Sequence, residues 1–258
     1  SGSWPLYDGT ALASKGIVLI TINYRLGIFG NFSHPQLSAE SAHKTSGNYG
    51  LTDQMLALHW VQNNISAFGG DAKNVTVFGE SAGSASLSRL MASPLAKGLF
   101  QKGIGQSAAA FMTLSDIKAD APGKLAAETI GLNFANAVGR ETVAKLRDMT
   151  AEDLLHAARA KLSTGLDQGI VDGWILPDQV YKIFSEGKQH DIPIVVGFNS
   201  GEGYYGGAKP AFISKKDYTS AVKAKYGPLA NEYLTIFPAD RWQSMQHDPY
   251  GDFFGWTM

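Results

Sequence analysis

The stretch Val75-Thr-Val-Phe-Gly-Glu-Ser-Ala-Gly83 decides the fold. Its first half is β-branched and apolar, which is typical of a strand covered on both faces of a parallel sheet. Its second half has the form Gly-x-Ser-x-Gly. Leu87, Leu90 and Met91 then follow at helical spacing until Pro94 ends the pattern. The sequence therefore predicts a strand, a tight turn around a serine, and a helix in immediate succession.

Gly-x-Ser-x-Gly at such a junction has a mechanical reason. The serine, here Ser81, sits in a strained conformation on a sharp turn that lifts its Oγ to the top of the sheet. Gly79 and Gly83 keep Cβ atoms out of the crowded space, and the amide of Ala82 points at the oxygen of a tetrahedral intermediate. The pattern also arises by chance in roughly one chain in ten of this length, but chance does not supply the strand and the helix around it. We therefore predict that Ser81 is a nucleophile and that Ala82 N–H is an oxyanion donor.

The rest of the chain predicts a parallel sheet with helices. Residues 16–24 and 192–198 are nearly continuous apolar runs, as in core strands, and apolar residues recur in steps of three and four over residues 51–68, as on a helix. Residues 120–165 are rich in Ala, Leu, Glu and Lys and predict surface helices or a cap. This order predicts one mostly parallel α/β domain over residues 1–258, with helices on both faces of its sheet.

Composition excludes several classes of function. The 258 residues carry 22 basic and 23 acidic side chains, a net charge of −1, so no basic surface for nucleic acid or anionic lipid is predicted. The longest apolar run, Gly16–Ile22, is far too short to span a bilayer. Cysteine is absent, and the six histidines lack the HExxH spacing. We expect no disulfide, no metal, no cofactor and no transmembrane segment in this chain.

We call the turn around Ser81, from Gly79 to Gly83, the elbow. Taken together with its flanking motifs, it makes the chain resemble the type-B carboxylesterases, the family that includes the cholinesterases. The motifs that carry the resemblance are Asn23-Tyr-Arg-Leu-Gly27, Gly47-Asn-Tyr-Gly-Leu-Thr-Asp-Gln54, Ala57-Leu-His-Trp-Val61, Phe68-Gly-Gly-Asp71 and Val75–Gly83, with Val171–Pro177 and Val196–Gly203 further on. The match is dense over residues 1–107 and thin over residues 110–165. Its cysteine-free, compact loops are more similar to bacterial members than to animal ones. The resemblance implies an α/β-hydrolase fold.

The resemblance also implies further site residues. Glu202, in a segment of the form Gly-x-Asn-x-x-Glu-Gly, takes the place of the charge-relay acid, although a solvated loop carboxylate is the alternative. Gly201 stands where relatives often carry Asp. Glu80 is implied to line the pocket and to add a negative charge there. Ser107 is implied to support the acid, and simple packing beside the elbow is the other interpretation.

Two parts of the family's machinery are not found in the sequence. Only His247 follows Glu202, and its Gln-His-Asp-Pro setting lacks the family's His-(Gly/Ser)-x-(Glu/Asp) context, so a surface role fits it better than that of the base. The family's Gly-Gly oxyanion donors precede Gly2-Ser3, where this chain begins. We therefore expect a fragment, incomplete at both ends, that lacks the N-terminal oxyanion-loop region and the C-terminal catalytic-histidine region and is inactive alone.

The expected function is hydrolysis of small carboxylic esters through a serine acyl-enzyme, without a cofactor. A non-catalytic adhesion or binding module is the alternative from another class, since the family contains such members, and a lipase would differ only in its substrate. The resemblance suggests a secreted or periplasmic protein. It does not indicate the acyl or alcohol preference.

Structural roles are favoured for four other residues. Arg25 and Asp53 could form a substrate clamp, but their positions in the family favour a buried ion pair that ties a strand loop to a helix. Met55 and Trp60 fall on or beside the apolar face of the helix predicted over residues 51–68. We expect both to be core residues.

Overall fold

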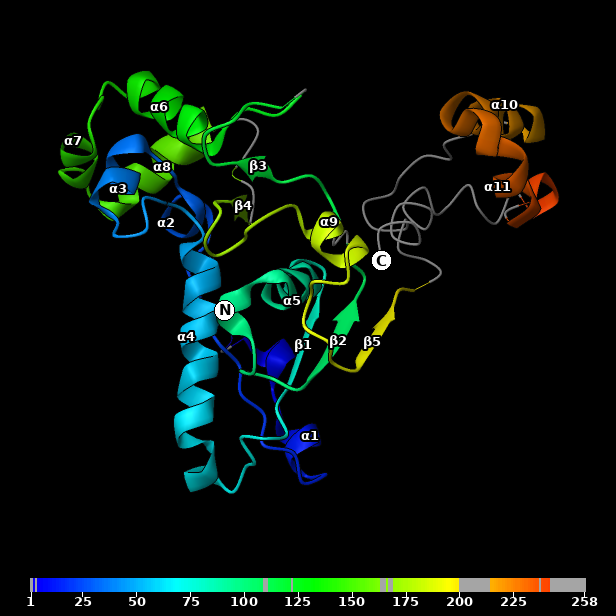
Figure 1. Ribbon diagram of the computed structural model, residues 1–258, viewed down its shortest axis with the longest axis horizontal. Coiled ribbons are helices and arrows are strands. Elements are labelled where there is room, and N and C mark those ends of the chain that lie inside the picture. The colour runs from blue at the N-terminus through cyan, green and yellow to red at the C-terminus, as the bar shows by residue number, and fades with distance from the viewer. Residues whose placement is uncertain are drawn as a thin grey trace.

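The computed structural model describes residues 2, 4–108, 111–121, 123–162, 166, 169–199, 214–236 and 238–241. Within them, the strands β1 (Thr76–Glu80), β2 (Lys102–Gln106) and β5 (Ile194–Gly197) form a parallel sheet in the order β1-β2-β5 (Figure 1). The short strands β3 (Ser115–Asp116) and β4 (Ile170–Val171) pair in a second sheet. The α-helices are α1 (Thr10–Ala13), α2 (Gly27–Asn31), α3 (Pro35–Glu40), α4 (Tyr49–Asn64), α5 (Ala82–Ala92), α6 (Ala127–Ala137), α7 (Val143–Arg147), α8 (Ala151–Lys161), α9 (Val180–Ser185), α10 (Lys215–Tyr226) and α11 (Ala230–Ile236). The 3-10 turns are η1 (Pro5–Tyr7), η2 (Ile65–Phe68), η3 (Pro94–Ala96), η5 (Gly227–Leu229) and η6 (Ala239–Arg241).

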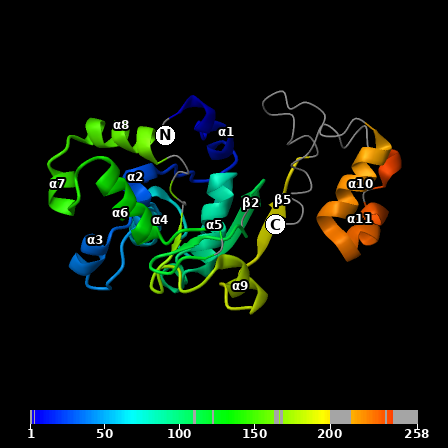
Figure 2. The ribbon, with the colours of Figure 1, turned by 90° about the horizontal axis from the view of Figure 1, so that it is seen from above.

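Helix α5 packs directly on the central sheet. Figure 1 shows it alongside β1 and β2, and Figure 2 shows it beside β2. Two glycines of β2 permit the close approach, because a Cβ at Gly103 would lie 3.0 Å from Leu87 Cδ2 and one at Gly105 would lie 2.7 Å from Ser84 Oγ. Leu87 is buried in the main core cluster, to which α4 and α9 also contribute. The helix that follows the serine is thereby held against β2, the strand next to β1.

The predicted long helix is confirmed as α4 followed by η2. Its buried side chains are Leu51, Met55, Leu58, Val61 and Ile65, in the expected steps of three and four. Gly69, with a φ of 79°, ends it in the left-handed conformation. The prediction that Trp60 is a core residue is wrong, since Trp60 is 46% exposed. Its ring contacts Phe68, which is also exposed.

Asn48 joins two segments that are distant in the sequence. It precedes α4 with a left-handed φ of 55° and is fully buried. Its Nδ2 donates to the Ile170 carbonyl oxygen at 2.8 Å, and the Ile170 N–H donates to its Oδ1 at 2.8 Å. The amide side chain thus replaces a neighbouring strand for Ile170 in β4. Gly47 allows this contact, because a Cβ there would lie 2.3 Å from Ile170 Cδ1.

The helices predicted over residues 120–165 are confirmed as α6, α7 and α8. They pack with the α2 region around a second hydrophobic cluster of buried residues, namely Ile28, Phe32, Phe134, Ala135, Leu146 and Ala158. Helices α10 and α11 share a further cluster of Tyr218, Val222, Ala230 and Tyr233. No helix among the described residues combines the length and the apolar composition that crossing a membrane requires.

Three segments predicted as core strands are more exposed than expected. Residues 16–24 form no strand, because no described segment pairs with them, and Ile17 and Val18 are 48% and 45% exposed. In β1 and β5, Phe78 and Val195 are 51% and 63% exposed. The reason is that α5 covers one face of the sheet, and α4 and α9 pack against α5 rather than on the other face. Full burial of these strands was therefore a wrong prediction for the described structure.

Candidate active site

Ser81 lies on the sharp turn between β1 and α5. Its φ of 52° and ψ of −114° are strained for a residue with a Cβ. Two backbone hydrogen bonds hold the turn, since Ser81 N–H donates to Gln106 O at 2.8 Å and Ala85 N–H donates to Ser81 O at 3.0 Å. The residue is exposed, and its hydroxyl does not cap α5. The turn therefore presents Oγ at the end of the sheet, as the motif predicts.

The two glycines of the motif differ in their surroundings. A Cβ at Gly79 would lie 2.5 Å from the carbonyl carbon of Gly83, which is backbone and cannot move aside. A Cβ at Gly83 would meet no described atom within 4 Å, and its φ is ordinary. The prediction of a crowded position is therefore confirmed for Gly79. It is wrong for Gly83 in the described structure.

Ala82 is the first residue of α5. The first amides of a helix have no acceptor within the helix, and the helix dipole makes this end attractive to negative charge. The Ala82 N–H follows Ser81 directly, so it lies beside the place where an oxyanion would form on an acyl group attached to Ser81. Its role as an oxyanion donor stays a prediction.

Ser107 occupies the matching position at the end of the neighbouring strand. Because Glu80 is the register partner of Gln106, Ser81 and Ser107 follow β1 and β2 side by side. Ser107 has a left-handed φ of 54° and is 3% exposed, whereas Ser81 is open to solvent. Its N–H donates to Gly197 O at 2.8 Å, which ties it to the end of β5. The ends of all three central strands are thus joined at the elbow.

The two predicted acids have different outcomes. Glu80 is the last residue of β1 and is exposed beside Ser81, and its role in lining the pocket with a negative charge stays a prediction. Glu202 follows β5 in the sequence but lies outside the described residues, as do Gly201 and His247. Its role as the charge-relay acid stays a prediction.

None of the five histidines that the structure describes forms a hydrogen bond with Ser81. His34 and His190 are buried, and burial lowers the pKa of both. His190 Nε2 lies 2.8 Å from Ser93 O, and His34 Nδ1 accepts from Gln36 N–H at 3.2 Å. The other described histidines, His43, His59 and His156, are exposed. Within the same residues, no three His, Asp or Glu side chains gather closely enough to hold a metal ion.

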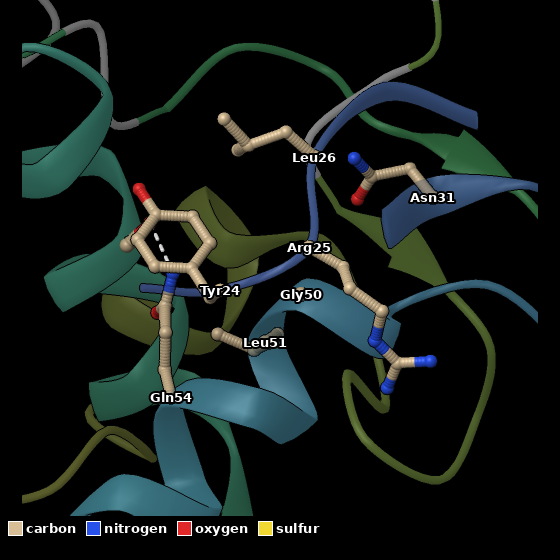
Figure 3. A pocket seen from close by; sticks show the side chains of 8 residues that line it. Tyr24, Arg25, Leu26, Asn31, Gly50, Leu51 and Gln54 are labelled. Atoms are coloured by element: carbon tan, nitrogen blue, oxygen red, sulfur yellow. Dashed lines mark hydrogen bonds between the residues drawn. The ribbon is translucent and has the colours of Figure 1, made fainter. Parts of the chain in front are cut away.

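A small cavity lies behind the elbow helix (Figure 3). Its volume is about 10 Å³, and it is lined by Tyr24, Arg25, Leu26, Asn31, Gly50, Leu51, Gln54 and Ser86. Gln54 Nε2 donates to Ser86 Oγ at 3.2 Å, which links α4 to α5. Gln54 Oε1 is buried and bonds no described residue, and the cavity is the size of one water molecule. Ser81 is not among the residues that line this cavity.

Arg25 and Asp53 form the predicted ion pair. Arg25 Nε and Nη2 donate to the two carboxylate oxygens at 2.8 and 2.7 Å, and the Arg25 N–H also donates to Oδ2 at 2.9 Å. The side-chain hydrogen bond from Arg25 lowers the pKa of Asp53. The pair is not buried as predicted, since the two side chains are 52% and 23% exposed. It lines an open groove of about 490 Å³ on the outside of α4.

A parallel sheet whose strand turns at a left-handed serine into a helix defines the α/β-hydrolase class. The sequence pattern of the carboxylesterase family matches residues 1–234. The chain belongs to this family, which confirms the resemblance found in the sequence.

The relatives are esterases by name. The chain is 39% identical over 248 residues to the para-nitrobenzyl esterase of Bacillus subtilis (strain 168), covering 92% of this chain and 48% of that protein. It is 38% identical over 243 residues to the fumonisin B1 esterase of Sphingopyxis macrogoltabida, covering 93% and 44%. A solved PNB esterase superposes with a TM-score of 0.72 at 37% identity, over 99% of this chain and 54% of the other. A Geobacillus stearothermophilus carboxylesterase gives 0.73 at 33%, over 95% and 52%. The chain thus spans about half the length of the relatives it matches.

Proposed function

We propose that this chain carries the nucleophile of a serine carboxylesterase that hydrolyses small carboxylic esters. The observation that carries the proposal is the geometry of Ser81, which is exposed, left-handed and placed at the N-terminus of α5. Membership of the carboxylesterase family supports it. The names of the two bacterial relatives specify esters as substrates, and we propose the same class of bond here.

The proposed reaction passes through an acyl-enzyme. Ser81 Oγ attacks the ester carbonyl carbon while a histidine takes the hydroxyl proton. The Ala82 N–H donates to the oxyanion that forms, and the intermediate expels the alcohol, which receives the proton. Water then attacks the acyl group by the same route, releasing the acid and restoring Ser81.

The other predicted residues serve this step indirectly. Glu202 accepts a hydrogen bond from the second nitrogen of the histidine and stabilises the imidazolium. Ser107, whose N–H holds the end of β5 at Gly197, supports the segment that leads to that acid. Glu80 adds a negative charge beside the nucleophile. The histidine itself is not among the described residues that contact Ser81.

The test is a pair of serine substitutions in the protein that carries this chain. Ser81→Ala should lower kcat for a para-nitrophenyl or para-nitrobenzyl ester by about 10⁴-fold or more, because the group that forms the covalent bond is lost. Ser88→Ala is the matched control. Ser88 lies on the same helix, bonds Ser84 O at 3.3 Å and is remote from the turn, so turnover should not change.

A fluorophosphonate probe gives a second measurement. It should label the wild type and Ser88→Ala at Ser81 and leave Ser81→Ala unlabelled. Undiminished hydrolysis by Ser81→Ala would contradict the proposal. A wild type that binds esters but is neither labelled nor active would favour the binding-module interpretation.

A further inference from the structure

His34 is a buried histidine whose ring caps a helix. It is the N-cap residue of α3 and is 1% exposed, and its ring stacks on Phe32 with centroids 6.2 Å apart. Its Nδ1 accepts the Gln36 N–H at 3.2 Å, so we assign the single proton of the neutral ring to Nε2. A helix of six residues depends on such a cap, because so short a helix is marginal by itself.

Glu128 of α6 lies against the same histidine. The packing of α6 is tight here, since a Cβ at Gly131 would lie 1.8 Å from Ser33 O and 3.5 Å from His34 Cα. Glu128 precedes Gly131 by three residues, a spacing that places both on one face of α6. Burial lowers the pKa of His34, and the charge of Glu128 opposes this change, so the carboxylate lies near the ring. His34 Nε2 and Glu128 Oε1 are both buried, and neither bonds any described residue.

Helix α7 is attached to α3 at both of its ends. The N–H of Val143, its first residue, donates to Gln36 Oε1 at 2.7 Å. Arg147, its last residue, donates from both terminal nitrogens to the carboxylate oxygens of Glu40 at 2.9 and 2.8 Å. Figure 1 shows the two helices together at one end of α4. Because Arg147 and Glu40 are 59% and 52% exposed, their ion pair contributes little, and the polar attachment depends mainly on the position of Gln36.

We propose that His34 is a proton-operated switch that releases α7 from α3. A proton added at Nδ1 turns the acceptor of the Gln36 N–H into a second donor, and two donors cannot form a hydrogen bond with each other. The backbone of His34 is fixed, since its N–H donates to Ser46 Oγ at 3.1 Å. The first turn of α3 must therefore open, which moves Gln36 away from Val143 and exposes the ring to water. This inference goes beyond the proposed function and does not depend on hydrolysis.

The direction of the switch follows from the groups around His34. Glu128, on α6, is the described charged group that acts on the ring. The charged residues of α3 and α7 pair with each other or with a neighbour at the surface, Arg147 with Glu40 and Lys145 with Glu141. Because burial lowers the pKa of the enclosed ring, the open form binds a proton at a higher pH than the closed form does. The open population is therefore constant above about pH 6.5 and rises by up to about tenfold per pH unit below it, until the enclosed ring is protonated as well.

Hydrogen exchange in the protein that carries this chain measures the opening. After correction for the intrinsic exchange rate, the protection of the Val143 and Leu146 amides should fall by up to about tenfold per pH unit below about pH 6.5. The amides of β2, which lies outside these contacts, should stay better protected throughout. Constant protection in α7 would overturn the proposal. Equal protection factors in α7 and β2 would do so as well, because the opening would then be global unfolding.

His34→Asn removes the switch and keeps the cap. The Oδ1 of Asn can accept the Gln36 N–H and is not protonated in this range, so the protection of α7 should no longer depend on pH. His156→Asn is the matched control, since His156 is exposed on α8, and it should respond as the parent protein does. A pH response in His34→Asn equal to that of the control would contradict the assignment to His34.

Glu128→Gln tests the same switch without changing the histidine, and it decides the question if His34→Asn does not fold. The substitution removes the charge that favours the imidazolium, so the pKa of the enclosed ring should fall further. The loss of protection in α7 should then continue to a pH lower by about half a unit or more before it levels off. Levelling at the same pH as in the parent protein would show that Glu128 does not act on the switch and would overturn this arrangement.

Discussion

At the scale of single residues, Asn48 shows how one side chain can replace a neighbouring strand as a hydrogen-bond partner. Its amide group exchanges two hydrogen bonds with the backbone of Ile170, in the way a paired strand would. An amide has one donor and one acceptor in this arrangement, so no other side chain of similar size reproduces both bonds. Asn is also among the few residues that adopt the left-handed conformation readily. Both properties explain why Asn stands before α4.

Substituting Asn48 should therefore destabilise the chain. Asn48→Ala leaves the N–H and the carbonyl of Ile170 buried without partners and should lower the free energy of unfolding by about 3 kcal/mol. Asn48→Asp keeps the acceptor for the Ile170 N–H but buries a carboxylate whose second oxygen faces the Ile170 carbonyl oxygen, so we expect a loss at least as large as that of Asn48→Ala. Urea unfolding followed by circular dichroism measures both. A variant as stable as the parent chain would contradict the role of these two hydrogen bonds.

The sequence revealed some of these residues and not others. Ser81 is recognisable because the glycines around it and the strand before it form a pattern with a mechanical cause. Asn48 and Gln54 were not singled out, because their partners Ile170 and Ser86 come from elsewhere in the fold. Both residues lie in the motif Gly47–Gln54 that carries the family resemblance, but nothing in that motif indicates their partners. Hydrogen bonds between residues far apart in the chain produce no recognisable pattern in the sequence.

At the scale of elements, the elbow depends on how closely β1 and α5 approach. Gly79 lies close to the backbone of Gly83. A methyl group added at Gly79 would collide with that backbone, whereas a methyl group added at Gly83 would meet no described atom. A strained turn persists only where its surroundings hold it. Here the neighbouring strand does so through the bond from Ser81 N–H to Gln106 O.

Alanine substitutions of the two glycines should therefore have opposite effects. Gly79→Ala forces its Cβ against the Gly83 backbone and should lower the free energy of unfolding by about 2 kcal/mol or more. Gly83→Ala meets no described atom and replaces a glycine in the first turn of a helix, so it should be neutral or stabilise by up to about 1 kcal/mol. Thermal unfolding of the two variants beside the parent chain checks this. A stable Gly79→Ala would contradict the close approach.

The elements most easily predicted are those whose pattern lies entirely within their own sequence. Helix α4 follows from the apolar steps of its own sequence. Residues 16–24 have the composition of a strand, but a strand also requires a neighbour to pair with. Composition indicates that a segment suits a sheet. It does not indicate which partner completes that sheet.

At the scale of the whole molecule, two buried histidines couple stability to pH. His34 stacks on Phe32 in the second cluster, and His190 contacts Phe100 in the main one. Burial lowers the pKa of each below its value in the unfolded chain. As pH falls below about 6.5, the unfolded state binds protons that the folded state does not, so stability decreases. Above that pH both states are neutral at these groups, and this contribution is constant.

The expected result is a loss of up to about 1.4 kcal/mol per pH unit for each histidine as pH falls through the interval between its unfolded and folded pKa values. His190→Gln should remove the contribution of one proton to the slope of unfolding free energy against pH. The exposed control His59→Gln should leave that slope nearly unchanged. Urea unfolding between pH 8 and pH 5 measures it. An unaltered slope in His190→Gln would contradict the assignment.

The same measurement bears on domain organisation. One domain over residues 1–258 stays a prediction, and it requires the two clusters that hold His34 and His190 to unfold in a single transition. Helices α10 and α11 have a cluster of their own around Tyr233, where Tyr226 and Tyr233 stack with centroids 4.3 Å apart. Separate midpoints for these parts would contradict a single domain.

The bond between Asn48 and Ile170 also orders events during synthesis. The two residues are 122 positions apart, and the strand, turn and helix around Ser81 lie between them. A chain made from its N-terminus releases this middle part first, and domains generally begin to fold as they emerge. The two hydrogen bonds between Asn48, which precedes α4, and Ile170 can therefore form only after the elbow has left the ribosome. Until Ile170 arrives, water must satisfy the amide of Asn48.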